Sequence, residues 1–284
     1  MTRALYDFQL DPLLLTALRE DLGQAGDLTT DATTRPEDRA RGRFNFRVPG
    51  RVAGMAVVRR TFALLDPTVS VTVHHDDGAD VAAGTCVATV EGPARAVLTG
   101  ERVALNLLAR LSAIATVTAQ AVALAAPHGC HIACTRKTTP GLRGLEKFAV
   151  AVGGGTNHRF GLHDGVLIKD NHIVVAGGVA EALSRARQTL GHMVKIEVEV
   201  DTLDQLDAVL ALGLADAVLL DNMGPDLLRE AVARVDGRLT TEASGGITLA
   251  NLAEVAATGV SLVSLGFLTH SVPALDIGLD FEVL

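Results

Sequence analysis

The sequence contains no tryptophan and few aromatic residues, which limits the kind of core it can build. Aromatic side chains make up 3% of its 284 residues, whereas hydrophobic residues of all kinds make up 48%. Alanine, valine, leucine and glycine supply most of the core, and small aliphatic side chains suit strands that are buried on both faces of a sheet. This composition excludes a disordered chain. The length predicts either one large α/β barrel or two domains.

Cysteine is also scarce, and three residues make no disulfide framework. Cys130 and Cys134 stand close to His128 and His131 in the sequence, so a zinc site is one alternative. Structural zinc takes four clustered nitrogen or sulfur ligands, and the alternation of a strand would scatter these side chains. We favour buried free thiols in a reducing cytoplasm.

Excess positive charge and long apolar runs are lacking as well. The chain has 25 basic and 33 acidic residues, a formal net charge of −8, which would repel nucleic acids and anionic membranes. The longest apolar stretch, 103–126, contains Arg110 and Gln120, and no run reaches the roughly 18 residues of a membrane span. Charged residues interrupt the N-terminal stretch, so no targeting segment is predicted. We expect a cytoplasmic protein that binds neither nucleic acid nor a membrane.

The first hundred residues have the character of a small antiparallel α+β domain. A short helix is predicted for 12–21, and strands are predicted for 42–48, 52–58, 69–75 and 85–90. Pro49-Gly50 and Asp77-Gly78 are turn signals between these strands.

After a long predicted helix, 96–126, apolar strands alternate with helical patterns. The predicted strands cover 130–135, 165–168, 194–198, 217–220, 239–243 and 261–265. The predicted helices between them cover 179–190, 203–212, 225–235 and 249–257. Thr202 and Gln205 have the spacing of a capping box, and Pro225 suits a first helical turn. Such alternation predicts a parallel sheet.

Polar or glycine residues follow each of these strands. From the second strand on they recur at intervals of about 22–30 residues, which is the length of a βα unit. They are Arg136-Lys137, Lys169-Asp170, Glu199, Asp221-Asn222, Ser244-Gly245-Gly246 and Gly266. A barrel with its active site at the carboxyl ends of its strands requires this pattern. An open doubly wound sheet would concentrate its chemistry at one switch point and usually carry a glycine-rich loop after its first strand. We therefore expect an α/β barrel.

The run from Thr135 to His172 is cationic within an acidic protein. Its basic residues, against three acidic ones, are Arg136, Lys137, Arg143, Lys147, Arg159 and Lys169. Such a run attracts small anions, while the acidic remainder repels polyanions. Arginine suits bidentate carboxylate recognition, and lysine acts as a point charge for phosphate. A solvated basic face is the alternative, but the run also contains three glycines, Gly153 to Gly155, that allow an anion to approach the backbone.

Two acids at successive strand ends, Glu199 and Asp221, could bind a divalent ion through oxygen ligands with waters retained, as magnesium prefers. They could also bind sugar hydroxyls, or simply pair with Lys169 or Lys195. Glu197 shares the face of Glu199 but lies deeper in the predicted barrel.

The glycines after the last two strands occupy the place where barrels commonly bind phosphate. Ser244-Gly245-Gly246 and Gly266 would offer backbone N–H groups and helix N-termini to such a group.

Through these residues the sequence resembles one enzyme family, the quinolinate phosphoribosyltransferases, also called nicotinate-nucleotide pyrophosphorylases (carboxylating). The matching motifs run in order along nearly the whole chain. They are Glu20-Asp21 to Thr29, Glu101 to Asn106, Thr135 to Arg143, Glu146-Lys147, Gly153 to Gly155, Asn157 to Arg159, Leu167 to His172, Glu197 to Glu199, Leu220 to Asn222, Glu242 to Ile247 and Leu268 to Ser271. Relatives often have Asp before the Thr-Arg-Lys run, where this chain has Cys134. We expect altered local packing there rather than lost activity.

The resemblance implies the type II phosphoribosyltransferase fold. Its parts would be an N-terminal open α/β sandwich domain (1–108), an incomplete α/β barrel (109–268) and a C-terminal tail (269–284) that returns to the first domain. The implied reaction transfers the phosphoribosyl group of phosphoribosyl pyrophosphate to quinolinate, with magnesium and with decarboxylation. The products would be nicotinate mononucleotide, pyrophosphate and CO2, a step of NAD biosynthesis. A homodimer or larger homo-oligomer is also implied, in which Arg102 reaches the site of the neighbouring subunit.

The family's functional residues carry over position by position. Those resembling the quinolinate-binding set are Arg102, Thr135, Arg136, His158, Arg159 and Lys169. Those resembling the phosphoribosyl pyrophosphate set are Lys137, Lys169, Glu199, Asp221, Ser244, Gly245, Gly246, Leu265, Gly266, Phe267 and His270. We expect catalytic roles for Lys137, Lys169, Glu199 and Asp221. The two acids are also the expected magnesium ligands, directly or through water.

Three other functions fit parts of the pattern. Lys169 at a strand end could form a Schiff base in a lyase. The same scaffold could bind anions without catalysis, as a sensor. The third alternative is a molybdenum-transport-associated paralogue within the same family, but it lacks the Lys-Asp-Asn-His run that Lys169 to His172 supply here.

Overall fold

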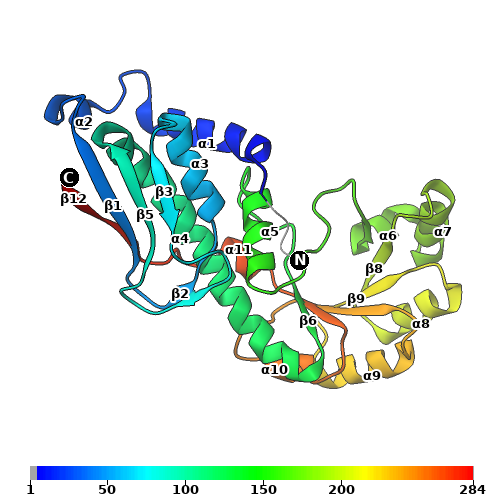
Figure 1. Cartoon of the computed structure of the whole chain (residues 1–284). Helices are drawn as coiled ribbons and strands as arrows, with labels where there is room; N and C mark the ends of the chain where they lie inside the picture. Colours follow the sequence, from blue (N-terminus) through cyan, green and yellow to red (C-terminus); the bar gives the residue numbers. More distant parts are fainter. Residues whose placement is uncertain (1–4, 284) are drawn as a thin grey trace. The chain divides into compact units, whose positions relative to one another are not determined.

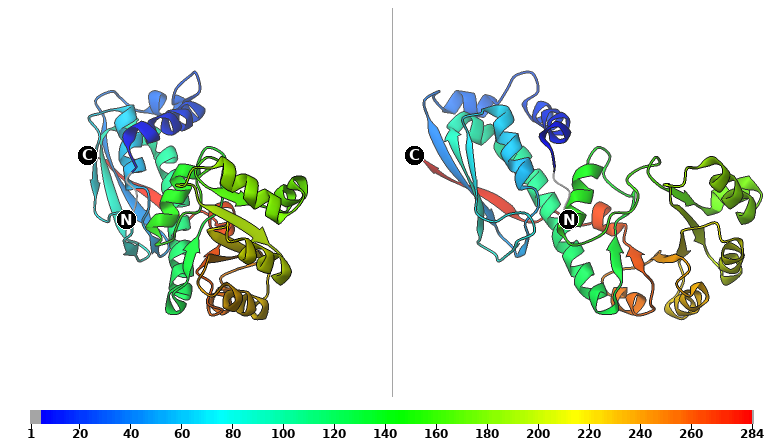
Figure 2. Two further views of the ribbon diagram at one scale, coloured as in Figure 1. Left: turned by 90° about the vertical axis from the view of Figure 1, so that its right-hand side faces the viewer. Right: turned by 45° about the vertical axis from the view of Figure 1, so that its right-hand side comes forward.

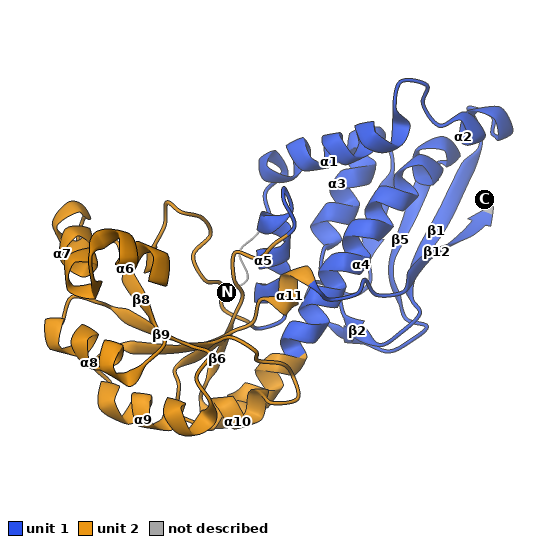
Figure 3. Cartoon of the chain, turned by 180° about the vertical axis from the view of Figure 1, so that it is seen from behind, with its two compact units in different colours: residues 1–119, 139–154, 271–284 blue, residues 120–138, 155–270 orange. Residues whose placement is uncertain are grey.

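The structure, a computed structural model, describes residues 5–283 of the chain (Figure 1). These residues form two compact units, coloured separately in Figure 3. Unit 1 contains residues up to 119, 139–154 and those from 271 on, and unit 2 contains 120–138 and 155–270. The units divide within a helix and not at residue 108. The three-part division at 108 and 268 stays a prediction.

Unit 1 is built on an antiparallel four-stranded sheet. Its elements are α1 (Asp7–Leu22), α2 (Leu28–Thr33), β1 (Arg39–Phe46), β2 (Gly50–Arg51), α3 (Met55–Leu65), β3 (Ser70–Val73), β4 (Asp80–Val81), β5 (Cys86–Pro93), most of α4 (Ala94–Ala125), α5 (Arg143–Val152) and β12 (Ile277–Val283). The sheet order is β12-β1-β5-β3, with β2 and β4 paired separately. The last strand of the chain, β12, pairs antiparallel with β1, and both views of Figure 2 show the two side by side.

The core of unit 1 lies between this sheet and its helices. Strand β1 alternates exposed and buried residues along its length, as a strand with one covered face does. Its buried residues Phe44 and Phe46 are fully enclosed with Phe62 of α3, and the rings of Phe44 and Phe62 meet edge to face at 6.2 Å. Large rings of this kind contribute much of the buried apolar area in a chain so poor in aromatics.

The strand predicted at 52–58 is wrong, because α3 begins within it. Gly54 adopts a left-handed conformation (φ 119°) directly before the helix. The Asp77 carboxylate accepts hydrogen bonds from the backbone N–H groups of Gly54 (2.7 Å) and Met55 (3.0 Å). A side chain distant in sequence thus satisfies helix-start donors that have no intrahelical partner. The β-branched residues Val57 and Val58 suggested a strand, but packing against the sheet favours the helix.

Unit 2 contains the predicted β/α alternation. Its elements are the end of α4, a 3₁₀ turn (Ala126–His128), β6 (His131–Ala133), β7 (Val166–Ile168), α6 (Asp170–Ala176), α7 (Val179–Thr189), β8 (Ile196–Val200), α8 (Leu203–Leu212), β9 (Ala217–Asp221), α9 (Pro225–Val235), β10 (Thr240–Ser244), α10 (Leu252–Ala256), β11 (Leu262–Ser264) and α11 (Phe267–His270). The predicted caps are present: Gln205 N–H donates to the Thr202 hydroxyl at 3.3 Å, and Pro225 lies in the first turn of α9.

The six strands of unit 2 form an incomplete parallel barrel. Their order is β6-β11-β10-β9-β8-β7, and every pair is parallel. Chain neighbours are therefore sheet neighbours except at β6 and β7, which do not pair in the described part of the chain. The connection between these two strands includes residues 139–154, which belong to unit 1. The predicted fold class, a sheet and helix domain followed by an incomplete α/β barrel, is confirmed.

Helix α4 is the long apolar helix expected from the sequence. With the following 3₁₀ turn it is long and apolar enough to cross a membrane, but half of its most apolar window is buried inside the structure. Leu108 is fully enclosed in the core of unit 1. We interpret α4 as a core helix, since core helices pass the same length test.

Candidate active site

The predicted polar side chains do gather at the carboxyl edge of the barrel. Lys169 directly follows β7, Glu199 lies near the end of β8, and Asp221 and Ser244 are the last residues of β9 and β10. Asp221 and Ser244 are direct partners in the β9–β10 register. The carboxyl ends of parallel strands meet at one edge, which is where barrels carry their sites.

Lys169 and Glu199 form an ion pair across this edge. The Lys169 Nζ lies 2.5 Å from Glu199 Oε2. Glu199 is largely buried, whereas Lys169 is half exposed. Lys169 also begins α6, and its backbone N–H donates to His172 Nδ1 at 2.9 Å. The backbone of Lys169 is thus fixed by this hydrogen bond, while its side-chain ammonium remains accessible to solvent.

Asp221 has a raised pKa, chiefly because it is partly buried. Burial and the neighbouring Asp201 raise the pKa of Asp221, although the cations of Lys169 and Lys137 oppose this shift. The side-chain amide of Asn222 donates a hydrogen bond to Asp221 Oδ2 at 2.6 Å. A carboxyl group with a raised pKa marks a place where added positive charge would be stabilising.

The loop after β10 packs tightly against the loop after β9. Asn222 has a positive φ of 54°, and its backbone N–H donates to the Ser244 carbonyl at 2.9 Å. Gly245 also has a positive φ, 93°, and a Cβ placed on it would lie 2.2 Å from Asn222 Oδ1. Glycine is therefore required at this position for two independent reasons.

The loop after β11 brings Lys137 and His270 together. A Cβ on Gly266 would lie 3.0 Å from Lys137 Cδ and 3.3 Å from His270 Nε2. The Thr269 hydroxyl donates to the Lys137 carbonyl at 2.6 Å, which ties the segment after β6 to the start of α11. Leu265 and Phe267 flank Gly266 in this loop. Both side chains thus lie close to the position that a side chain at residue 266 would occupy, and a lysine beside a bare backbone is suited to phosphate.

Arg136 and Arg159, both of the predicted quinolinate-binding set, are near enough for the charge of one to affect the pKa of the other. We call the place where they lie the dicarboxylate site. Burial, and then the charge of Arg136, lower the pKa of Arg159, while Glu197 and Asp164 oppose the shift. The Arg159 guanidinium also donates to the Gly165 carbonyl at 3.0 Å. Two neighbouring positive charges suit a ligand that carries more than one negative charge.

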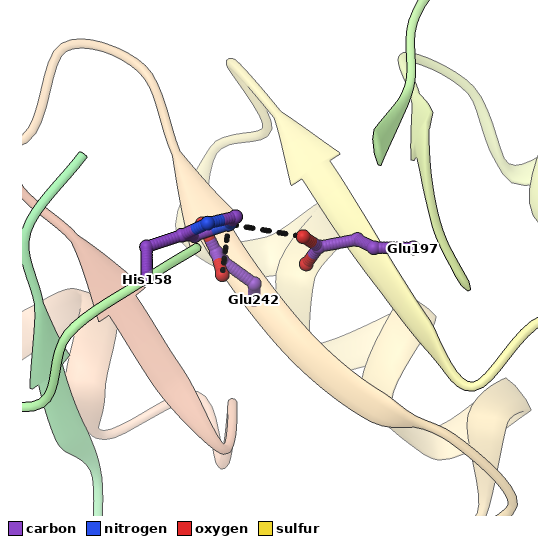
Figure 4. A group of neighbouring side chains, drawn as sticks. All are labelled: His158, Glu197 and Glu242. Carbon is purple, nitrogen blue, oxygen red and sulfur yellow. Dashed lines mark hydrogen bonds and ion pairs between the residues drawn. The ribbon is translucent and has the colours of Figure 1, made fainter. Parts of the chain in front are cut away.

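Beside these arginines His158, Glu197 and Glu242 form an acid–histidine cluster (Figure 4). The His158 Nε2 lies 3.0 Å from Glu197 Oε2 and 3.6 Å from Glu242 Oε2. His158 Nδ1 accepts a hydrogen bond from the Arg159 backbone N–H at 2.8 Å. Burial and the Glu197 carboxylate raise the pKa of Glu242 from 4.5 to about 7.

Glu242 was not among the residues that the sequence nominated for the site. It lies inside β10 and not at the strand's end, so the strand-end criterion passed over it. The sequence did offer a signal, an acidic residue in the middle of a predicted core strand. Acidic residues are almost never fully buried without a partner, so such a residue indicates a buried polar group nearby.

Not every predicted residue is assembled in unit 2. Arg102 lies on α4 in unit 1, with a side chain 64% exposed.

Thr135 lies in unit 2 and acts on the local backbone. Its hydroxyl accepts a hydrogen bond from the Lys137 backbone N–H at 3.0 Å, so it orders the turn that carries Lys137.

The cationic run is divided between the two units. Its middle part, with Arg143 and Lys147, forms α5 in unit 1, where Lys147 is buried. The neighbouring Glu146 is fully buried and pairs with Arg110. The basic residues of the run are therefore shared between the two units, and those in unit 2 come from the two ends of the run.

The zinc alternative gains no support from the described residues. Among them, the acid–histidine cluster is the group found close enough to share an ion, and it contains no cysteine. Burial raises the pKa of the Cys130 thiol to about 11. The Cys134 thiol donates to Asn157 Oδ1 at 3.1 Å, so the residue that departs from the family pattern has a local packing partner.

Comparisons with known proteins place this geometry in a family. Residues 27–112 match the family model for the quinolinate phosphoribosyl transferase N-terminal domain, and residues 114–280 match that for the C-terminal domain. The chain is 48% identical over 272 residues to a probable nicotinate-nucleotide pyrophosphorylase (carboxylating) of Bacillus subtilis, covering 96% of this chain and 93% of that protein. It is 45% identical to the nicotinate-nucleotide pyrophosphorylase (carboxylating) of Mycobacterium leprae, covering 93% and 94%.

The solved structures agree with the sequence matches. The crystal structure of NadC from Streptococcus pyogenes superposes with a TM-score of 0.95 at 37% identity, covering 99% of both chains. The nicotinate-nucleotide pyrophosphorylase of Ehrlichia chaffeensis superposes with a TM-score of 0.92 at 36% identity. This chain belongs to the quinolinate phosphoribosyltransferase family.

Proposed function

We propose that this chain is a decarboxylating quinolinate phosphoribosyltransferase of NAD biosynthesis. It transfers the phosphoribosyl group of phosphoribosyl pyrophosphate to quinolinate and forms nicotinate mononucleotide, pyrophosphate and CO2. The observation that carries the proposal is the gathering of Lys169, Glu199, Asp221 and Ser244 at the carboxyl edge of the barrel, where Lys169 and Glu199 form an ion pair. Relatives that match more than 90% of the chain are named for this reaction.

The arginine pair is the proposed binding site of quinolinate. The substrate has carboxylates on adjacent ring carbons, and two guanidinium groups can each bind one in a bidentate way. A bound dianion would oppose both the burial of Arg159 and the charge of Arg136, which together lower the pKa of Arg159. His158, Lys169, and Thr135 through the turn that carries Lys137, are the other unit 2 residues of this proposed site.

The loops after β10 and β11 are the proposed binding site of phosphoribosyl pyrophosphate. Lys137 supplies positive charge and His270 a ring nitrogen beside Gly266, and Ser244 to Gly246 offer backbone N–H groups. Phosphate oxygens favour such a combination of cations and a backbone without side chains.

The bond changes follow from this placement. The pyridine nitrogen of quinolinate forms a bond to the anomeric carbon as the pyrophosphate oxygen leaves with the electron pair of its bond. Positive charge develops on the sugar ring, and the carboxylates of Glu199 and Asp221 would stabilise it. The ring then loses CO2 from the carbon beside the positively charged nitrogen, and that carbon takes up a proton. Fixed cations around the ring stabilise the negative charge that builds up there.

Magnesium is part of the proposal, and the residues fit it. Glu199 and Asp221 offer carboxylate oxygens on neighbouring strands, and a cation bound beside Asp221 would oppose the burial and the Asp201 charge that raise its pKa. A hard divalent cation with retained waters suits such a place. Bound there, it would neutralise charge on the pyrophosphate leaving group.

The function is tested by mixing the protein with magnesium, quinolinate and phosphoribosyl pyrophosphate. We expect stoichiometric nicotinate mononucleotide, pyrophosphate and CO2, and loss of turnover on chelation of the metal. Binding of quinolinate without pyrophosphate release would favour the sensor. Trapping of Lys169 by borohydride with a carbonyl substrate would favour the lyase. Productive use of nicotinate in place of quinolinate would contradict the carboxylating assignment.

A shared active site in a homodimer or larger homo-oligomer is also proposed, with Arg102 acting in the neighbouring subunit. Its exposed side chain on α4 is available for that role. Arg102→Ala and Lys169→Ala subunits should each be inactive, yet a mixture should recover about a quarter of the wild-type activity. Half of randomly mixed dimers are heterodimers, and one site in each is intact under two-fold symmetry. No recovery despite proven subunit exchange would contradict a shared site.

We place the enzyme in the cytoplasm. All three cysteines are free thiols, as suits a reducing compartment.

A further inference from the structure

The acid–histidine cluster has no part in the bond changes described above, although it lies against the proposed dicarboxylate site. Glu242 projects from β10, Glu197 projects from β8, and His158 reaches both from the connection between β6 and β7 (Figure 4). The Glu242 side chain is 3% exposed and also bonds to Ser264 of β11. A carboxyl group so well enclosed needs a reason for being there.

The hydrogen bonds define the tautomer of His158. Its Nδ1 faces a backbone N–H, that of Arg159, which can only donate. Nδ1 is therefore the acceptor, and the ring proton is on Nε2, which donates to Glu197. One N–H then faces two carboxyl groups, at 3.0 Å and 3.6 Å, and the side-chain ligand atoms of the three residues all lie within 4.8 Å of one another. Two carboxylates that are so close and so little exposed repel each other unless one of them is protonated, so we take the cluster to hold a second proton.

A metal ion would fit the same three side chains less well. Bound at Nε2, it would move the ring proton to Nδ1, because a metal-ligating neutral imidazole carries its proton on the other nitrogen. That proton would point at the Arg159 N–H, and two donors would face each other. The geometry favours protons over a metal.

We propose that Glu242 is a positioning residue of the dicarboxylate site: it retains a proton, fixes the His158 ring and through it the backbone of Arg159, and leaves one negative charge beside the arginine pair instead of two. This inference rests on the proposed function, because it takes Arg136 and Arg159 to be the groups that bind quinolinate.

The proton on Glu242 makes substrate affinity depend on pH. The groups that face Glu242 are Glu197, His158 and Ser264, and Arg159 lies beyond them. Burial and the Glu197 charge raise the pKa of Glu242 to about 7. As the pH rises through this value the cluster gains a second negative charge, which opposes a dianion nearby. Affinity for quinolinate should therefore be high below about pH 7 and fall above it, and binding near neutral pH should take up a proton.

The direct test compares the wild type with Glu242→Gln, which keeps the shape of the side chain and removes its titration. Between about pH 5.5 and 8.5, the wild-type KM for quinolinate should rise on the order of tenfold, the effect of one nearby charge. The KM of Glu242→Gln should stay nearly constant over this range. The KM for phosphoribosyl pyrophosphate should show no such difference between the two proteins.

The matched control is Glu254→Gln. Glu254 is exposed on α10 in the same unit, so the change in net charge is equal but remote. This variant should keep the wild-type pH profile. If Glu242→Gln keeps that profile too, or lowers kcat and both kcat/KM values equally at every pH, the inference is wrong and Glu242 serves stability alone.

A calorimetric measurement on the wild type needs neither a variant nor turnover. Quinolinate binding at about pH 7.5, measured in buffers of different ionisation enthalpy, should show proton uptake. Zero uptake with clear binding would overturn the inference and leave the proposed function intact. Absence of nicotinate mononucleotide in the turnover assay would instead count against the proposed function. Stoichiometric binding of zinc or manganese that Glu242→Gln abolishes would overturn the proton arrangement.

Discussion

Replacing Lys169 with methionine should lower kcat/KM for nicotinate mononucleotide formation by about a hundredfold to a thousandfold, the usual cost of losing one fixed electrostatic group in a site. Methionine keeps most of the length of lysine but removes its charge. Glu199 loses the ammonium that lies 2.5 Å from it, and Asp221 loses a cation that lowers its pKa. Two adjacent acids would then repel the anionic substrates that Lys169 attracts.

The matched control for this substitution is Lys195→Met. Lys195 precedes β8, at the opposite end of the strand that carries Glu199, and pairs with Asp216 at 2.9 Å. It is 83% exposed, so its ion pair should contribute less than about 1 kcal/mol. Steady-state kinetics and thermal unfolding of both variants separate the local role from a general one. If Lys169→Met kept a third of the wild-type activity, its proposed catalytic role would be wrong.

Much of the barrel could be predicted because its signals are local. Strands β7, β9 and β11 are short and mostly apolar, and polar or glycine residues follow the predicted strands at the length of a βα unit. Thr202, Gln205 and Pro225 mark helix starts through their own neighbours in sequence. The carboxyl ends of parallel strands share an edge whatever the side-chain details. The assembly of Lys169, Glu199 and Asp221 follows from that rule.

What could not be predicted depends on contacts distant in sequence. The start of α3 at Met55 depends on Asp77, whose carboxylate caps the helix from another segment. The enclosure of Glu242 depends on Glu197 and His158, which reach it from other parts of the chain. A pattern read along one segment contains neither partner, so propensity alone gave a strand in the first case and no site residue in the second.

The division of the cationic run has the same origin. Net charge is counted along the sequence, but the two compact units are defined by contacts in space. Residues 139–154 belong to unit 1, whereas the two ends of the run belong to unit 2. The charge counted between Thr135 and His172 is therefore divided between the two units, which a count along the sequence cannot show.

Replacing Gly245 with alanine should lower kcat/KM for phosphoribosyl pyrophosphate by about a hundredfold. The new Cβ would lie 2.2 Å from Asn222 Oδ1 and 3.0 Å from the Asn222 backbone nitrogen. Asn222 cannot rotate away freely, because its side chain donates to Asp221 at 2.6 Å. The methyl group would thus displace the residue that orients a proposed magnesium ligand, and quinolinate binding at the arginine pair should change much less.

Because Gly245 has a positive φ, the Gly245→Ala variant also suffers backbone strain. A control variant separates the effect of this strain from that of the clash. Gly213 ends α8 with φ 64°, and a Cβ there would meet nothing within 4 Å. Gly213→Ala should therefore cost about 1–3 kcal/mol of stability from backbone strain and leave the kinetics unchanged. Asn222→Gly, which suits φ 54°, completes a double-mutant cycle. If the clash acts through the Asn222 side chain, the Gly245→Ala/Asn222→Gly double variant should be little worse than Asn222→Gly alone. Full additivity of the two losses would show that the methyl group acts by another route, such as direct obstruction of a phosphate at the Gly245 backbone.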